Sequence, residues 1–164
     1  MTFESDTWFV DLYERHVDTV FRVCRTHLRN AADAEDAVQN VFLKLLVKPL
    51  TFESVEHEKA WLIRVAINHC KDVEKSSWSK RAGIEEIQEP IAVDSDPAAV
   101  YDTLLERVME LPENLRVCVY LYYYEGYTSA EVAVLIGKPH STVRNYLSEA
   151  RKVLRKRLSG DFDE

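Results

Sequence analysis

Residues 128–158 read TSAEVAVLIGKPHSTVRNYLSEARKVLRKRL, and this stretch decides how the C-terminal part of the chain is expected to fold. A short apolar segment, residues 129–136, ends at Gly137, and a longer basic segment begins after His140. Thr128 is a typical N-cap residue and Gly137 a typical C-cap residue. The pattern therefore predicts a helix, a turn of about three residues and a second helix to about residue 158, which is the outline of a helix-turn-helix motif.

The two predicted helices carry apolar residues that can pack them together and polar residues that can reach DNA. In a helix-turn-helix the second helix enters the major groove, and its first residues meet base edges. Arginine can pair with guanine, and asparagine with adenine, through two hydrogen bonds each. The expected packing residues are Val132, Ala133, Ile136, Val143 and Leu147. The expected DNA-binding residues are His140, Ser141, Thr142, Arg144, Asn145, Arg151 and Lys152, with Ser141 also serving as the N-cap of the second helix.

The charge of the chain is distributed unevenly. The whole chain carries a net charge of −7, which by itself argues against binding to nucleic acid. Residues 138–158, however, hold seven basic residues and one acid, and a local positive potential of this kind suits phosphate. The alternative is a helical hairpin whose basic face is only solvated, with Arg155, Lys156 and Arg157 interacting with their own helix dipole.

Three further helices are predicted in the N-terminal part. Apolar residues recur at helical spacing over residues 5–29, 34–47 and 55–75, with Asp33 as the N-cap of the second helix and Pro49 after its end. The expected inward residues are Trp8, Phe9, Leu12, Val17, Val20, Phe21, Cys24 and Leu28, then Ala37, Val38, Val41, Phe42, Leu45 and Leu46, then Trp61, Leu62, Val65, Ala66 and either His69 or Cys70.

Between the two parts lies a stretch of different composition. Residues 82–98 contain Gly83, Pro90 and Pro97, and residues 82–102 hold six acids and no Lys or Arg. Such a composition is typical of a linker. We therefore expect an all-α fold with two small domains, residues 1–81 with three to four helices and residues 99–164 with four, joined by an acidic linker at 82–98. The first C-terminal helices are expected over residues 99–110 and 113–125.

Composition also sets limits on compartment and chemistry. Three cysteines without close spacing do not form a disulfide framework, so Cys24, Cys70 and Cys118 are expected to be free thiols in a reducing cytosol. The first eleven residues include acids and no Lys or Arg, unlike a signal peptide, and no apolar run is long enough to span a bilayer. Cys24 and His27 share a helix face, but a zinc site needs about two more ligands. We expect no enzyme activity, catalytic residue, metal or cofactor.

Two groups of motifs together suggest a family. The first group is residues 33–42, DAEDAVQNVF, followed by residues 59–68, KAWLIRVAIN. The second group is Leu-Pro-Glu at 111–113, Tyr-Glu-Gly-Tyr-Thr at 124–128 and Glu-Val-Ala at 131–133, then Ser-Thr-Val-Arg at 141–144 and Ala-Arg at 150–151. In order and spacing the chain resembles the bacterial sigma-70 family, in its extracytoplasmic-function group, over about residues 5–75 and 99–158.

The resemblance implies a sigma factor that directs RNA polymerase to promoters from the cytoplasm. Its implied partners are core RNA polymerase, promoter DNA and an anti-sigma protein, without insertion into a membrane. The N-terminal domain would bind the polymerase clamp and the minus-10 element, and the C-terminal domain the minus-35 element. The implied polymerase-binding residues are Asp36 and Gln39, with Phe42 in the core. The implied minus-10 residues are Asn68, Lys71, Lys75, Trp78, Lys80 and Arg81, where basic groups and an aromatic ring suit single-stranded DNA.

Departures from the family pattern leave alternatives open. The predicted recognition helix has Tyr146 and Glu149 where the family usually has basic residues, and Asp72 and Glu74 dilute the basic group after Asn68. Base preference should therefore not be transferred. Trp78 could equally pack against the core or the linker. The alternative functions are a stand-alone helix-turn-helix regulator, which would leave the N-terminal motifs unexplained, and a helical adaptor without a DNA role.

Overall fold

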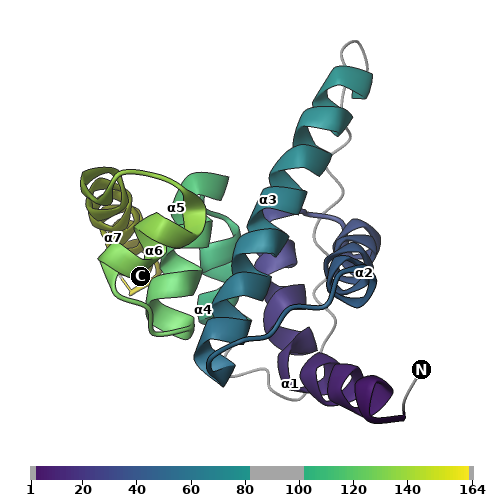
Figure 1. The fold of residues 1–164 in the computed structure, drawn as a ribbon. Helices are drawn as coiled ribbons and strands as arrows, with labels where there is room; N and C mark the ends of the chain where they lie inside the picture. Colours follow the sequence, from purple (N-terminus) through teal and green to yellow (C-terminus); the bar gives the residue numbers. More distant parts are fainter. Residues whose placement is uncertain (1–2, 82–101, 163–164) are drawn as a thin grey trace. The chain divides into compact units, whose positions relative to one another are not determined.

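The computed structural model describes residues 3–81 and 102–162, with side chains for residues 7–76 and 106–157. Within these residues the chain forms α-helices and one π-helical turn, and no strand (Figure 1). The all-α prediction is therefore confirmed. The chain divides into unit 1, Met1–Ile91, and unit 2, Ala92–Glu164. The predicted linker at 82–98 lies outside the described residues, and the exact domain limits remain predictions. None of the helices described combines the length and the hydrophobicity needed to cross a bilayer.

The described part of unit 1 contains three helices, each packed against the other two (Figure 1). They are α1 (Phe3–His27), α2 (Ala31–Val47) and α3 (Val55–Arg81). The fully buried apolar residues recur at helical spacing on each element, as an amphipathic helix requires. They include Leu12, Val20, Val23, Cys24, Ala34, Val41, Leu45, Leu62, Ile63, Ala66, Ile67 and Cys70.

Helix α2 begins earlier than the sequence suggested. The predicted N-cap, Asp33, is wrong, because Asn30 occupies that position and its Oδ1 accepts a hydrogen bond from Ala32 N at 2.8 Å. Asp33 instead lies in the first turn, where a carboxylate interacts favourably with the positive end of the helix dipole. Helix α3 continues past residue 75 to Arg81, since the next helix-breaking residue is Gly83.

Several residues expected in the core of unit 1 lie only partly within it. Half-buried are Trp8, Phe9, Val17 and Phe21 of α1 and Trp61 and Val65 of α3, and Leu46 of α2 is exposed. Leu46 is 49% exposed because it follows the buried Leu45, and neighbouring residues point about 100° apart on a helix. The half-buried Trp61 has its ring 5.6 Å from that of Phe52. Of the pair left open by the sequence, Cys70 is buried and His69 is half-buried. The other predicted residues of α2 and α3 are buried.

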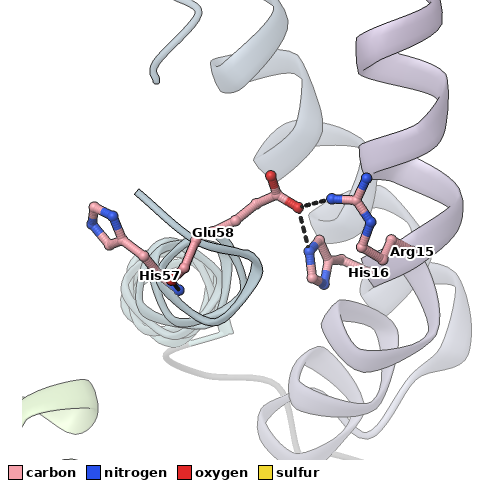
Figure 2. A network of polar contacts seen from close by, with 5 residues as sticks. Arg15, His16, His57 and Glu58 are labelled. Atoms are coloured by element: carbon pink, nitrogen blue, oxygen red, sulfur yellow. Dashed lines mark hydrogen bonds and ion pairs between the residues drawn. The ribbon is translucent and has the colours of Figure 1, made fainter. Parts of the chain in front are cut away.

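A buried polar network joins α1 to α3 (Figure 2). One oxygen of Glu58, Oε1, accepts a hydrogen bond from Arg15 Nη1 at 2.5 Å and lies 2.6 Å from His16 Nε2. The side chains of Glu58 and His16 are 9% and 4% exposed, whereas that of Arg15 is 40% exposed. His57, the neighbour of Glu58, points away from this network. A carboxylate that is buried between two helices and shared by two partners fixes how those helices pack.

Unit 2 contains α4 (Asp102–Met109), α5 (Glu113–Val119), the π-helical turn η1 (Tyr120–Tyr124), α6 (Ser129–Ile136) and α7 (His140–Phe162). Helices α5 and α6 both pack against α7, and α4 packs against α5. Arg116 of α5 is buried, and its Nη1 donates to Met109 O at 3.3 Å and to Leu111 O at 3.5 Å. The first bond satisfies a carbonyl group in the last turn of α4, and the second satisfies one in the turn between α4 and α5.

The π-helical turn η1 was not predicted. The sequence indicated one helix over residues 113–125, but Glu125 N donates to Tyr120 O at 3.2 Å, a bond that spans five residues instead of four. Tyr120 is buried, and its hydroxyl group donates to Glu125 Oε1 at 2.6 Å. This bond holds the wide turn closed from the inside. Such turns are rare within α-helices. Where they do occur, they are frequently found at functional sites.

The three cysteines are free thiols, as predicted, and all three are buried. Cys24 and Cys70 lie in unit 1, and Cys118 lies in unit 2. Burial raises the pKa of the Cys118 thiol to about 11. This thiol is therefore protonated and unreactive at neutral pH.

Candidate nucleic-acid interface

Helices α6 and α7 form the predicted helix-turn-helix. Five apolar residues pack the two helices together, and all five are buried, as predicted: Val132, Ala133, Ile136, Val143 and Leu147. Helix α7 begins at His140, and the predicted N-cap Ser141 is wrong. Pro139 already accepts hydrogen bonds through its carbonyl oxygen from Thr142 N at 3.0 Å and Val143 N at 3.2 Å, so Ser141 lies inside the first turn.

Helix α6 is capped at both ends as the sequence predicted. Thr128 and Glu131 form a capping box, in which Glu131 N donates to Thr128 Oγ1 at 3.1 Å and Thr128 N donates to Glu131 Oε1 at 2.9 Å. The hydrogen bond from the Thr128 backbone, followed by that of its side chain, lowers the pKa of Glu131. At the other end Gly137 has a φ of 70°, and Lys138 N donates to Ala133 O at 3.0 Å.

We predict that Gly137→Ala destabilises unit 2 by about 1 kcal/mol, because a Cβ atom disfavours the left-handed conformation of Gly137. Apart from Gly137 and its two chain neighbours, no residue has an atom within 4 Å of the position that this Cβ would take, so the cost is conformational and not steric. Urea denaturation followed by circular dichroism would measure it. Ala130→Gly, at an exposed position of α6, is the control for the general effect of glycine, and equal stability of Gly137→Ala and the parent chain would contradict the prediction.

The exposed face at the start of α7 carries the predicted base-reading residues. His140, Ser141, Arg144 and Asn145 are exposed, and Thr142 is half-buried. His140 is not free of contacts, because its Nε2 lies 2.7 Å from Ser129 Oγ. This hydrogen bond joins the first residue of α6 to the first residue of α7. Sequence reasoning missed Ser129, since nothing in the local pattern shows that these two helix starts meet.

The middle of α7 carries Arg151 and Lys152, both exposed. Arg151 Nε donates to Tyr123 Oη at 2.8 Å, and its guanidinium carbon lies 6.0 Å from the centre of the Tyr122 ring. Nothing in the local sequence pattern indicates that Tyr122 and Tyr123 meet this arginine. Further along α7, Arg157 Nη1 donates to Glu110 Oε2 at 3.3 Å, so this cation has an acidic partner within unit 2.

The exposed face of α2 carries the predicted polymerase-binding residues. Asp36 and Gln39 are exposed, and Phe42 is buried, as expected. Leu43 and Leu46 are exposed at the next helical spacings on the same side, so the polar face continues into an apolar one. A stripe of this kind, with polar and apolar groups in series, is suited to a protein partner.

The exposed face of α3 carries part of the predicted minus-10 group. Asn68 and Lys75 are exposed, and Lys71 is half-buried. Burial, followed by the positive charge of Lys44, lowers the pKa of His69, so this imidazole adds no charge to the surface at neutral pH. Trp78, Lys80 and Arg81 continue α3, and their side chains lie outside the described residues.

Comparison with known families matches both units. The family model described as Sigma-70 region 2 matches residues 12–80, and the model described as Sigma-70, region 4 matches residues 101–154. The chain belongs to the sigma-70 family. In this sigma factor the first match falls on α1 to α3, and the second covers α4 to α6 and most of α7.

Curated relatives of this sigma factor extend over most of its length. It is 24% identical over 165 residues to the ECF RNA polymerase sigma factor SigW of Bacillus subtilis, covering 92% of this chain and 88% of the relative. It is 26% identical over 151 residues to the ECF RNA polymerase sigma factor SigM of Mycobacterium tuberculosis, covering 92% and 76%. The resemblance to the extracytoplasmic-function group is thereby confirmed.

Solved structures share the fold of this sigma factor. The sigma factor RpoE of Bartonella quintana, solved in complex with the anti-sigma factor NepR, matches with a TM-score of 0.67 and 19% identity, covering 96% of this chain and 98% of that chain. CnrH, solved with the cytosolic domain of CnrY, matches with a TM-score of 0.61 and 20% identity, covering 93% and 88%. The predicted pair of sigma-type helical domains is therefore confirmed as a fold.

Proposed function

We propose that this sigma factor binds core RNA polymerase, directs it to promoters and helps to open the DNA there. One observation supports this most: a single chain carries two sigma-70 regions, each with an exposed polar face at the positions that the family motifs indicate. The sigma factor itself carries out no chemical step in this proposal. RNA synthesis belongs to the polymerase.

Unit 1 would hold the polymerase through α2 and the minus-10 element through α3. Asp36 and Gln39 are exposed and can accept or donate hydrogen bonds to a protein partner. Asn68 lies on a different helix, exposed, with Lys75 two turns further along. An amide for base edges and a cation for the phosphate chain are suited to a melted strand. Trp78, Lys80 and Arg81 would extend this surface.

Unit 2 would read the minus-35 element as duplex DNA. Arg144 and Asn145 are exposed in the first turns of α7, where the recognition helix of a helix-turn-helix meets base edges. His140, Ser141 and Thr142 precede them on the same helix, and Arg151 and Lys152 follow at a distance suited to phosphates.

The net charge and the solved relatives bear on how the chain binds DNA and on a further protein partner. A chain with a net charge of −7 is expected to bind free DNA weakly, so tight promoter binding should require the polymerase. The solved relatives RpoE and CnrH were each captured with a second protein, in the first case an anti-sigma factor. We propose that this chain also binds an anti-sigma protein and that it acts in the cytoplasm.

Reconstitution would test the proposed function. The purified chain is mixed with core RNA polymerase, the mixture is separated by gel filtration, and the complex is tested for initiation at defined start sites on genomic DNA fragments. A sigma factor co-elutes with the core enzyme and confers discrete start sites. A stand-alone regulator would bind duplex DNA without polymerase and confer none, and an adaptor would do neither.

We predict that Asn68→Ala slows promoter opening about tenfold, as expected for the loss of a side chain that hydrogen-bonds a base in the melted strand. Binding to core polymerase should stay unchanged, since Asn68 is exposed on α3 and the proposed polymerase face lies on α2. Permanganate footprinting over time would measure opening. Asn145→Ala is the matched control and should weaken initial binding without changing the opening rate. Normal opening by Asn68→Ala would contradict the role assigned to Asn68.

A further inference from the structure

Tyr123 and Arg151 form an exposed pair, in which Arg151 belongs to the proposed DNA-binding residues and Tyr123 has no role assigned so far. Tyr123 lies on η1 and is 53% exposed, although the residues around it on η1 are buried or half-buried. Arg151 lies 28 residues later on α7 and is also exposed. A hydrogen bond of 2.8 Å joins Arg151 Nε to Tyr123 Oη. The pair therefore lies on the surface of unit 2 and is held together before any ligand arrives.

The direction of this hydrogen bond leaves donors available. Arg151 donates through Nε, and the oxygen of Tyr123 accepts, so the hydroxyl proton of Tyr123 can be donated elsewhere. The two terminal guanidinium nitrogens of Arg151 have no recorded partner among the described residues and belong to an exposed side chain. Three donor groups, two of them on the charged guanidinium of Arg151, thus lie side by side. This arrangement suits the oxygens of a phosphate group.

The surroundings hold both side chains in place. The centre of the Tyr122 ring lies 4.8 Å from the centre of the Tyr123 ring, in an edge-to-face arrangement. It lies 6.0 Å from the guanidinium carbon of Arg151. The backbone of η1 is fixed by the bond from Glu125 N to Tyr120 O. An arginine that is already ordered loses less conformational entropy on binding than a mobile one. The hydrogen bond from Arg151 to Tyr123 also raises the pKa of Arg151, which favours its charged form.

The position on α7 indicates which phosphate the pair would meet. Arg151 follows Arg144 by seven residues, which places both on the same face about 10 Å apart along the helix. The major groove is about 12 Å wide, so a side chain at this distance from a base-reading residue reaches the sugar-phosphate chain at the edge of the groove.

We propose that Tyr123 and Arg151 together bind one backbone phosphate of the duplex next to the minus-35 element. Tyr123 acts twice in this site, as a donor to the phosphate and as the residue that positions Arg151. The ligand is a phosphodiester oxygen, so the site adds affinity without base specificity. This inference rests on the proposed role of unit 2 as a reader of duplex DNA.

The test uses the holoenzyme of this chain with core polymerase, bound to a promoter fragment, with affinity measured over a range of salt concentrations. The variants are Tyr123→Phe, Arg151→Gln and the double variant. Tyr122→Phe is the control for the loss of a tyrosine hydroxyl. Arg157→Gln is the control for the loss of a cation, because Arg157 is already paired with Glu110. The thermal midpoint of each variant shows whether folding has changed.

If the pair binds phosphate, Arg151→Gln lowers the slope of log affinity against log salt by about 0.9, the value for one phosphate contact. Tyr123→Phe should weaken binding about threefold to tenfold at an unchanged thermal midpoint. The factor by which the double variant loses affinity should be smaller than the product of the two single factors, because the two side chains act as a unit. Both effects should be the same on promoters of different minus-35 sequence.

Three outcomes would overturn the inference. In the first, both single variants keep the parent affinity and slope. In the second, the affinity loss of the double variant equals the product of the two single losses, which would show that Tyr123 does not act through Arg151. In the third, DNA binding is unchanged and the variants instead lose an acidic protein partner. A holoenzyme that forms and initiates normally in these cases keeps the proposed function intact. Failure of the parent chain to form a holoenzyme would instead remove the proposed function.

Discussion

Replacing Glu58 with alanine should lower the free energy of unfolding of unit 1 by about 3 kcal/mol, because removing one partner of a buried charged network leaves the others unpaired. Glu58 Oε1 is the shared partner of Arg15 and His16, at 2.5 Å and 2.6 Å. Arg15 can turn toward water, but the buried ring of His16 cannot, so its Nε2 would lose this partner in the interior. The contact between α1 and α3 should therefore loosen first.

Tryptophan fluorescence can isolate this effect in the intact chain. The three tryptophans, at positions 8, 61 and 78, all lie within unit 1, so the signal during urea denaturation reports on that unit. Glu58→Gln keeps a hydrogen-bond acceptor of the same shape and should lose less stability than Glu58→Ala. Glu56→Ala, at an exposed position two residues earlier, is the matched control and should be nearly neutral. Equal midpoints for the variants at positions 56 and 58 would show that the network adds nothing to stability.

Arg144→Ala should reduce promoter-specific initiation about 5-fold to 150-fold, because the loss of one bidentate contact between arginine and a base costs about 1–3 kcal/mol. Arg144 is exposed in the second turn of α7, and its neighbour Val143 is fully buried against α6. The alanine variant should therefore fold normally. The loss should be largest on promoters that depend on the upstream element.

The decisive measurement compares promoter variants in single-round transcription. Each base pair of the minus-35 element is substituted in turn. Substitution at every contacted position should lower initiation by the parent holoenzyme. Initiation by the Arg144→Ala holoenzyme should be insensitive to substitution at one of these positions. Lys152→Ala is the contrasting variant, because a phosphate contact weakens binding to all sequences alike. If Arg144→Ala weakened every promoter equally and kept its full response to base changes, Arg144 would be a phosphate contact and not a base reader.

Local signals in the sequence predicted the helix-turn-helix closely. Thr128 and Gly137 cap α6 as expected, because capping depends on residues within one helical turn. The same kind of reasoning placed the N-caps of α2 and α7 wrongly. Asn30 competed with Asp33, and Pro139 left Ser141 inside α7. Where several residues could cap a helix, the choice depends on how the preceding chain is held, which the local sequence does not contain.

Tertiary contacts account for what could not be predicted. Glu58 and His16 are 42 residues apart in the sequence, and a glutamate in a helical pattern is ordinarily assigned to the exposed face. Arg116 is buried for a similar reason, since it binds a carbonyl group at the end of α4 and another in the turn that follows. In the candidate site, the exposure of Arg144 and Asn145 follows from helical periodicity. The partners of His140 and Arg151 do not, because they come from other elements.

The buried thiols allow transient opening to be measured separately in each unit. Cys24 and Cys70 lie in unit 1 and Cys118 lies in unit 2, and all three are shielded from solvent. An alkylating reagent would reach them only during excursions that expose the interior. The rate of modification at each cysteine, read by mass spectrometry, would compare the opening of the two units in one sample. It would also show which unit a bound partner protects.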